Sequence, residues 1–480
     1  MSHGRVIAKN AVWLLAATAA QKLIAFLTFT VIARLTGAEV TGQFFYAVSI
    51  TSVFVVLTDL GMTPVVIREM AQDELRGRAA LARAVVAKAL LIPLAIASSL
   101  GYALIVHAST TLFLAVALAC FVMSADAVSL LWYGAIRGKR QLRHEALGMF
   151  FGQMISASVS IAAAVWHAGP IGLVFGLLCG SAWNVGWSIW QAHALGITLA
   201  HQDRWLFREL AIKSFPFALA GGFVKIYSYV DTLLLRQFFS DSVVGYYAVA
   251  YKLTYAFQFL PLAFVAALYP GMSAAHASPE RDALRHLFME SLRLMMIVSV
   301  PIVALLSGFA FTIIPLIYGR AFLASVAPLT LLPWVLIPIF VDFPIGSLLN
   351  ATHRAGKKTT AMGITCAINV TANVILVPRY GPLGAAIAGV VSFWTLLAVG
   401  TFFVRRDLPS VGWMTWLVAR GSGVALVAWI VIRFWLSSFS LPIALALATG
   451  LLFVLLVVSG LVTRPDLMII KRLLRRESTI

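Results

Sequence analysis

Residues 10–35 read NAVWLLAATAAQKLIAFLTFTVIARL, an apolar run of the length that crosses a bilayer as an α-helix. Similar runs recur along all 480 residues, of which 61% are hydrophobic and only 11% are charged, and the mean hydropathy is +0.94. These runs are continuous and do not alternate between apolar and polar residues, so they predict helices and not the strands of a β-barrel. The sequence therefore predicts an all-α polytopic membrane protein.

Charge clusters and Gly/Pro punctuation divide the chain into about 14 transmembrane helices. We expect an N-terminal six-helix bundle over 1–200, a linker over 201–213, a second six-helix bundle over 214–406, and two additional helices with a basic tail over 407–480. The linker sequence DRWLFRELAIK has the pattern of an amphipathic helix lying along the membrane surface, and an ordinary linker is an equal alternative.

The basic residues predict the orientation of these helices. Most of the 36 lysines and arginines fall in alternate loops, on one side of the membrane. The opposite side receives few basic residues: Arg34, Arg236, Arg320, Arg379 and Arg433. By the positive-inside rule, both termini are expected in the cytoplasm. The net charge of +18 is dispersed over short loops, which argues against a nucleic-acid partner.

The two bundles share an internal repeat. VTGQFFYAV, from Val40, resembles VVGYYAVAY, from Val243, and the match aligns Gly42 with Gly245. The loop sequence GPIG at 169–172 likewise recurs as GPLG at 381–384. Six helices separate corresponding positions, so both bundles have the same orientation and their pseudo-symmetry axis runs along the membrane normal, as in many transporters. Chance similarity among glycine-rich segments is the alternative.

Three lysines lie within predicted spans: Lys22, Lys225 and Lys252. A charged side chain at the bilayer centre is costly, so such residues usually face a bundle interior or an aqueous cavity. Lys22 and Lys225 are 203 positions apart, the same offset as Gly42 and Gly245. We therefore expect each bundle to contribute one midplane amine to a central cavity.

The span around Lys225 also contains Tyr229 and Asp231. Lys225 and Tyr229 are four residues apart and share a helix face, whereas Asp231 is six residues from Lys225 and cannot pair with it within the helix. Asp231 is expected either to pair with Lys252 of the next span or to carry a coupling proton.

Asp126 and Asp342 are the other deep acids and are candidates for ion coupling, with internal hydrogen bonding as the alternative. The sequence contains no Walker A, HExxH, GxSxG or dinucleotide-binding pattern. Its three cysteines follow no metal-ligand spacing. No enzyme activity, cofactor or metal site is predicted.

Residues 9–71 carry a family resemblance. The order KNAVWLL…QKLIAFLTFTVIARLTGAEVTGQFFYAVSITSVFVVLTDLGMTPVVIREMA resembles the polysaccharide-export branch of the multidrug/oligosaccharidyl-lipid/polysaccharide (MOP) flippase superfamily, the Wzx-type O-antigen and exopolysaccharide flippases. The resemblance implies two pseudo-symmetric six-helix bundles in a V that rock between inward-open and outward-open states. It also implies translocation of an undecaprenyl-diphosphate-linked oligosaccharide from the cytoplasmic to the periplasmic leaflet of a bacterial inner membrane.

The resemblance and the midplane charges lead to one site hypothesis. Ammonium groups in a low-dielectric cavity attract a diphosphate more strongly than they would in water. We expect Lys22 and Lys225, helped by Lys252, to hold the diphosphate, while Tyr229 lines the sugar path. A polysaccharide polymerase and a chain-length regulator are expected partners. The alternatives are a multidrug or organic-cation antiporter of the same superfamily, and a membrane polymerase or scaffold.

Overall fold

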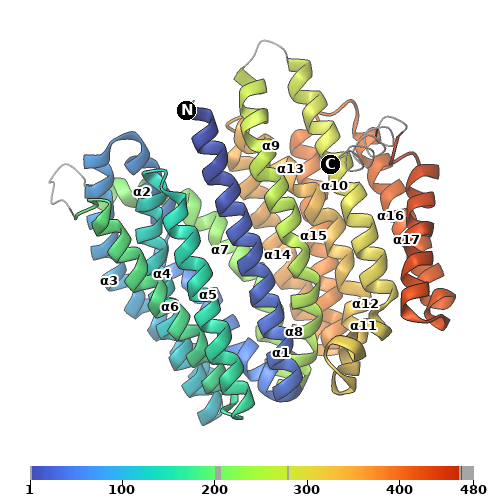
Figure 1. Ribbon diagram of the computed structural model, residues 1–480, viewed down its shortest axis with the longest axis horizontal. Coiled ribbons are helices and arrows are strands. Elements are labelled where there is room, and N and C mark those ends of the chain that lie inside the picture. The colour runs from blue at the N-terminus through green and yellow to red at the C-terminus, as the bar shows by residue number, and fades with distance from the viewer. Residues whose placement is uncertain (1–2, 200–206, 278–280, 464–465, 467–480) are drawn as a thin grey trace, which may run out of the picture. The chain divides into compact units, whose positions relative to one another are not determined.

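The computed structural model describes residues 3–199, 207–277, 281–463 and 466, and over these residues every regular element is helical (Figure 1). The α-helices of the first half are α1 His3–Asp59, α2 Met62–Gln72, α3 Glu74–Ile105, α4 Thr110–Gly138, α5 Leu142–Val165, α6 Gly169–Ala194, α7 Phe207–Phe238 and α8 Asp241–Tyr255. Those of the second half are α9 Phe259–Ala277, α10 Arg281–Gly308, α11 Ala310–Ile317, α12 Val326–Leu331, α13 Leu336–Ala351, α14 Ala355–Tyr380, α15 Pro382–Val404, α16 Val411–Phe434 and α17 Leu441–Val458.

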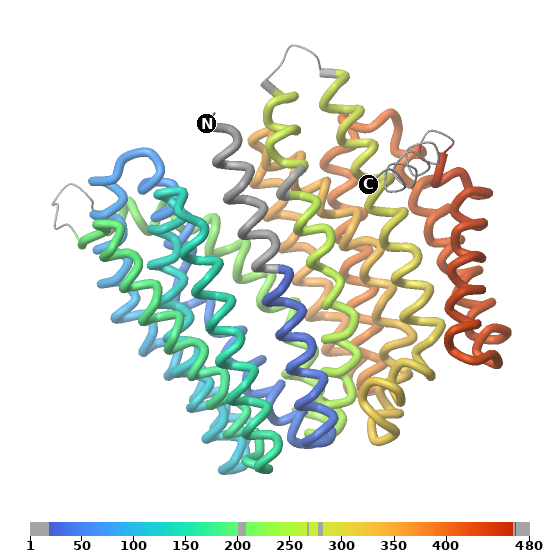
Figure 2. The backbone as a smooth tube through the Cα atoms, in the orientation of Figure 1, coloured from blue at the N-terminus to red at the C-terminus, as the bar shows by residue number. Residues whose placement is uncertain are grey.

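The described residues contain 13 segments that are long and apolar enough to cross a membrane. The first segment, Ala19–Asp59, has 41 residues, and a straight helix of that length would span about 60 Å, roughly twice the hydrocarbon core. It is not straight, because Gly37 interrupts α1 with φ 77° and ψ 179°, a left-handed conformation that glycine adopts without strain. Figure 2 shows the tube bending sharply at the far end of its first arm. The all-α membrane fold is confirmed, and the two arms of α1 account for the difference from 14 helices.

Packing contacts divide the chain into two compact units. Unit 1 comprises 1–259, 317–325 and 362–388, and unit 2 comprises 260–316, 326–361 and 389–480. Helices α7 and α8 belong to unit 1. The boundary between bundles that the sequence predicts at 201–213 remains a prediction. Helix α7 begins at Phe207, so the described part of that linker is the start of this helix. The linker residues 201–206 lie outside the described residues, as do 464–465 and 467–480 of the expected basic tail.

In unit 1, α4, α5 and α6 pack closely around small side chains. Gly176 of α6 lies against Ser160 of α5, and Gly180 lies against the backbone of Gly152. Added side chains would force these helices apart, so the small residues set the close approach of α5 and α6. Helix α8 packs in the same way on the second arm of α1, where Gly42 faces Gly245.

In unit 2, the proline-rich segment 326–351 is divided between two α-helices. Pro333 lies in a 3-10 turn, Leu332–Val335, that separates α12 from α13. Proline lacks the N–H that an α-helix needs at this point, which explains the break. Helix α10 packs against both α13 and α16.

Candidate functional site

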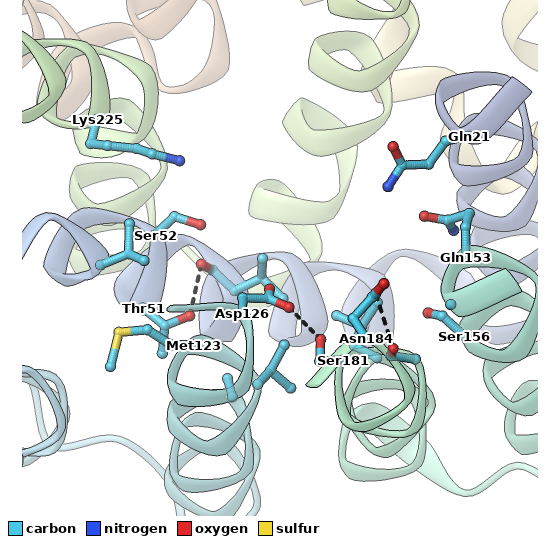
Figure 3. Close-up of a pocket in the computed structure, with 17 residues that line it drawn as sticks. Gln21, Thr51, Ser52, Met123, Asp126, Gln153, Ser156, Ser181, Asn184 and Lys225 are labelled. Carbon is cyan, nitrogen blue, oxygen red and sulfur yellow. Dashed lines mark hydrogen bonds between the residues drawn. The ribbon is translucent and has the colours of Figure 1, made fainter. Parts of the chain in front are cut away.

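Unit 1 contains a polar cavity of about 290 Å³ (Figure 3). Its walls come from both arms of α1 and from α4, α5, α6 and α7. Helices α5 and α6 pack closely through small residues. Residues three or four apart share a helix face, so each of these helices presents a row of polar side chains to the cavity. The cavity therefore has hydrogen-bonding groups on several sides, in spans that are otherwise apolar.

Lys225 of α7 and Asp126 of α4 are the two charged residues of the cavity wall. Figure 3 shows the Lys225 amine extending into the space from one side and Asp126 lying beside Ser181 at another. The two charges attract each other, but within the described ranges neither forms an ion pair. Ser181 Oγ donates a hydrogen bond of 2.6 Å to Asp126 Oδ1. An amine without an ion-pair partner among the described residues thus shares one cavity with an exposed carboxylate.

Neutral polar side chains make up the rest of the polar wall. They are Gln21, Thr51, Ser52, Gln153, Ser156, Ser181 and Asn184. Asn184 is held in place, since its Oδ1 accepts a hydrogen bond of 2.8 Å from Tyr133 and its Nδ2 donates one of 3.1 Å to the Gly180 carbonyl. Sequence reasoning missed this set. The available signal was the spacing of Gly180, Ser181 and Asn184 on one face of α6, combined with Gln153 inside an apolar span.

The three predicted lysines all lie in unit 1. Lys22 is exposed and follows the cavity residue Gln21, and its charge acts on both Lys225 and Lys252. The Lys252 amine lies 5.6 Å from the ring centre of Phe29 and 5.4 Å from that of Phe45. Within the described ranges, none of the three amines is paired with a carboxylate. Of the three lysines, only Lys225 lines the cavity.

Tyr229 lies beside Lys225, as the four-residue spacing predicts. The Lys225 amine is 5.8 Å from the centre of the Tyr229 ring, a distance at which a cation–π attraction acts. Tyr229 also interacts with Ser52, a residue of the cavity wall. Tyr229 therefore supports the wall next to Lys225 without lining the cavity itself.

Asp231 is buried away from the cavity, and its expected pairing with Lys252 is wrong. Its carboxylate accepts hydrogen bonds from the Tyr247 hydroxyl and from the backbone N–H and hydroxyl of Thr232. Tyr247 and Lys252 are five residues apart on α8, which places them about 140° apart around the helix. The face of α8 that meets Asp231 therefore carries Tyr247, and Lys252 faces the aromatic rings.

Asp342 lies in unit 2, on α13, where it forms a mostly buried ion pair with Lys358 at the start of α14. Lys358 lies within α14 and neutralises Asp342. The cavity belongs to unit 1, so Asp126 is the predicted coupling acid that the structure places at the cavity.

Comparisons with known proteins show which family model and which relatives the chain matches. A model of the family described as "Polysaccharide biosynthesis protein" matches residues 7–276. The "Probable low-salt glycan biosynthesis flippase Agl15" of Haloferax volcanii is 24% identical over 201 residues, which cover 41% of this chain and 42% of that protein. The match thus spans less than half of this curated relative.

Solved structures show the same fold. A structure titled "Lipid II flippase MurJ, inward closed conformation" matches with a TM-score of 0.73 and 14% identity, covering 95% of this chain and 100% of that one. An inward-facing multidrug resistance MATE family transporter of the MOP superfamily matches with a TM-score of 0.62 and 13% identity, covering 83% of this chain and 98% of that one.

Proposed function

Because the chain belongs to the polysaccharide biosynthesis protein family, we propose that it is a flippase for a lipid-linked oligosaccharide and acts by alternating access. The substrate is a glycan repeat unit joined through a diphosphate to undecaprenol, and it moves from the cytoplasmic to the periplasmic leaflet of a bacterial inner membrane. Both termini lie in the cytoplasm. A polysaccharide polymerase and a chain-length regulator would use the product.

The Lys225 amine, which lines a polar cavity of unit 1 and has no ion-pair partner in the described part of the chain, carries this proposal. Within a mostly apolar span, an unpaired ammonium group is costly unless it has water or an anion as a partner. A diphosphate is such an anion, and its attraction to the amine is stronger in a low-dielectric cavity than in water. Lys22 adds positive charge nearby, and Lys252 extends the positive field on α8.

The neutral part of the wall suits the glycan. Sugar hydroxyls both donate and accept hydrogen bonds, as do the amides of Gln21, Gln153 and Asn184 and the hydroxyls of Ser52 and Ser156. These groups bind sugars without a fixed charge, so the wall is compatible with an uncharged repeat unit. Tyr229 keeps Lys225 in position beside the sugar path.

We assign the coupling role to Asp126, which lines the cavity and faces the charge of Lys225. A diphosphate bound to Lys225 offsets the positive charge that stabilises the Asp126 carboxylate. Asp126 then takes up a proton more readily. The occupancy of Lys225 and the protonation of Asp126 are therefore coupled. Asp231 and Asp342, whose carboxylates are already bonded inside the protein, act as structural groups.

An organic-cation antiporter is the second candidate, because the carboxylate of Asp126 in the cavity would attract a cation. The Lys225 amine on the same cavity repels a cationic substrate, which favours the flippase. Efflux of a cationic dye by cells that express the protein, lost in Asp126→Asn, would favour the antiporter.

Complementation of a deletion strain tests the flippase. The strain should accumulate lipid-linked oligosaccharide on the cytoplasmic leaflet, and the wild-type gene should clear it. Lys225→Ala should fail to clear it at normal protein level, whereas Lys225→Arg, which keeps the charge, should restore part of the export. Full clearance by Lys225→Ala would remove Lys225 from the site. A deletion strain without such accumulation would contradict the flippase function.

A further inference from the structure

Unit 2 contains an apolar groove of about 660 Å³ between α15 and α16, called here the α15–α16 groove. The α15 side is a single helical stripe that includes Trp394, Leu397 and Thr401. The α16 side is a matching stripe that includes Met414, Val418 and Ser422. The groove therefore follows the two helices over about three turns, since its stripe on α15 spans residues 394–405.

Small side chains keep this groove open. Ala398 of α15 and Ala419 of α16 line it and are exposed, whereas other residues of α16 pack against α10 and α17. An apolar space open to a bilayer is filled by hydrocarbon, because water inside it would lack hydrogen-bonding partners. The shape and composition of the groove thus fit an extended hydrocarbon chain.

One end of the groove carries positive charge. Arg405 lines this end, and its guanidinium lies 4.2 Å from the ring centre of Phe402. Arg406 follows it and is likewise exposed. Asp407, in the loop that follows α15, forms an ion pair of 2.9 Å with Arg354. Within the described ranges, Arg405 and Arg406 have no carboxylate partner.

We propose that the α15–α16 groove binds an anionic phospholipid, with one acyl chain in the groove and the headgroup phosphate on Arg405. Arginine suits a phosphate because its planar guanidinium donates two parallel hydrogen bonds. By volume the groove has room for about twenty methylenes, if each occupies roughly the 30 Å³ of a water molecule in the liquid, which is more than one ordinary acyl chain contains. The groove has a cationic end at Arg405 and an apolar remainder. A phospholipid has the same order, with a charged headgroup followed by an acyl chain.

This site is separate from the polar cavity of unit 1 and does not depend on the proposed flippase function. Its ligand is a bulk membrane lipid that stays bound, whereas a transported lipid would have to leave. An anionic phospholipid here stabilises the packing of unit 2 and places a negative headgroup next to the loop after α15.

Native mass spectrometry of the purified full chain tests the site, with phosphatidylglycerol and phosphatidylcholine of identical chains as the probes. The wild type should retain phosphatidylglycerol in preference. Arg405→Gln should weaken retention about fivefold, the effect expected for one arginine near an anionic headgroup. Arg406→Gln is the matched control and should weaken it much less, because Arg406 does not line the groove.

A second pair of variants tests the acyl chain. Ala419→Phe fills the groove and should reduce retention of both lipids, whereas Val427→Phe adds the same ring to an exposed position of α16 outside the groove and should leave retention unchanged. Equal losses in Arg405→Gln and Arg406→Gln would show a diffuse charge effect and overturn the site. Unchanged retention in Ala419→Phe, or equal retention of the two lipids by the wild type, would also overturn it.

Discussion

Gly42 and Gly245 meet backbone to backbone where the second arm of α1 crosses α8. A Cβ atom added to Gly42 would lie 2.9 Å from the backbone nitrogen of Gly245, and it would also overlap the backbone of Asp241. These glycines are the pair that the internal repeat aligns, so a segment of the first repeat packs on its own counterpart in the second. A twofold relation between repeats produces this kind of contact, and Lys22 and Lys225 are separated by the same offset.

The first prediction concerns this crossing. Gly42→Ala should lower the free energy of unfolding by about 2 kcal/mol or more, because the helices must separate to admit the methyl group. Gly101→Ala is the control, since nothing lies within 4 Å of a Cβ at that position in α3, and it should be neutral or slightly stabilising. Thermal unfolding in detergent measures both. Equal melting temperatures for the two variants would refute the close crossing.

The second prediction concerns Asp126. Asp126→Asn removes the group that exchanges a proton in the proposed cycle, so export should fall about tenfold, equivalent to about 1.4 kcal/mol, and the remainder should no longer respond to an uncoupler. Ser181→Ala removes only the hydrogen bond to this carboxylate and should have a smaller effect. Transport into inverted membrane vesicles, with and without the uncoupler, measures both rates. A wild-type response to the uncoupler in Asp126→Asn would exclude Asp126 from coupling.

The third prediction concerns the buried bond between Asp231 and Tyr247. Tyr247→Phe leaves the Asp231 carboxylate short of a partner, which should cost about 1–3 kcal/mol of stability. Tyr269→Phe, at an exposed position, should cost almost nothing. Export per folded molecule should stay normal in both variants. A loss of export at unchanged stability in Tyr247→Phe would instead place Asp231 in the transport cycle.

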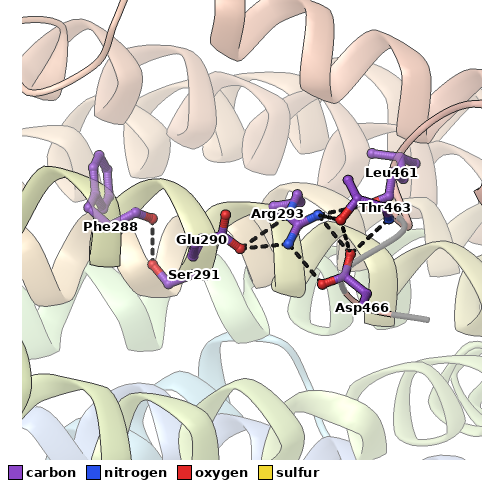
Figure 4. A network of polar contacts seen from close by, with 7 residues as sticks. All are labelled: Phe288, Glu290, Ser291, Arg293, Leu461, Thr463 and Asp466. Atoms are coloured by element: carbon purple, nitrogen blue, oxygen red, sulfur yellow. Dashed lines mark hydrogen bonds and ion pairs between the residues drawn. The ribbon is translucent and has the colours of Figure 1, made fainter. Parts of the chain in front are cut away.

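The fourth prediction concerns pH and the segment after α17. Asp466 accepts hydrogen bonds from Thr463 and forms an ion pair with Arg293 of α10, which also contacts Glu290 (Figure 4). Partial burial raises the pKa of Asp466, but the bonds from Thr463 and Arg293 outweigh it and hold this pKa below its usual value. A carboxyl with a lowered pKa stabilises the fold above its unfolded pKa, and this stability is lost as the pH falls through the folded pKa.

Acidification below about pH 5 should therefore destabilise the wild type more than Asp466→Asn, and the difference should grow as the pH falls further through the folded pKa of Asp466. Melting temperatures across this range measure the difference. Parallel curves for the two proteins would show that the Asp466 carboxylate contributes nothing to stability.

The sequence alone predicts the helices because their signal is local. Each span is an apolar run of the required length, and Gly37 marks the turn that divides α1 into two arms. The position of Lys225 in a cavity was also predictable, since a lysine in an apolar span has few other acceptable surroundings. Its closeness to Tyr229 follows from helical spacing alone.

The partners across helices could not be predicted, because they depend on the rotation of one helix relative to another. Asp231 meets Tyr247 and not Lys252, although both residues lie on α8. Ser181 and Asn184 line the cavity because α5 and α6 pack through small residues. Neutral polar side chains occur in many spans, so the sequence did not single out this pair.

The proposed role of Lys225 in binding a lipid diphosphate is tested most directly by transport in liposomes. The purified protein would be reconstituted with a fluorescent diphosphate-linked oligosaccharide lipid, and its movement between leaflets followed by quenching from outside. The account predicts rapid movement with the wild type, slower movement with Lys225→Arg, and only the rate of protein-free liposomes with Lys225→Ala. Movement at the wild-type rate with Lys225→Ala would contradict the account.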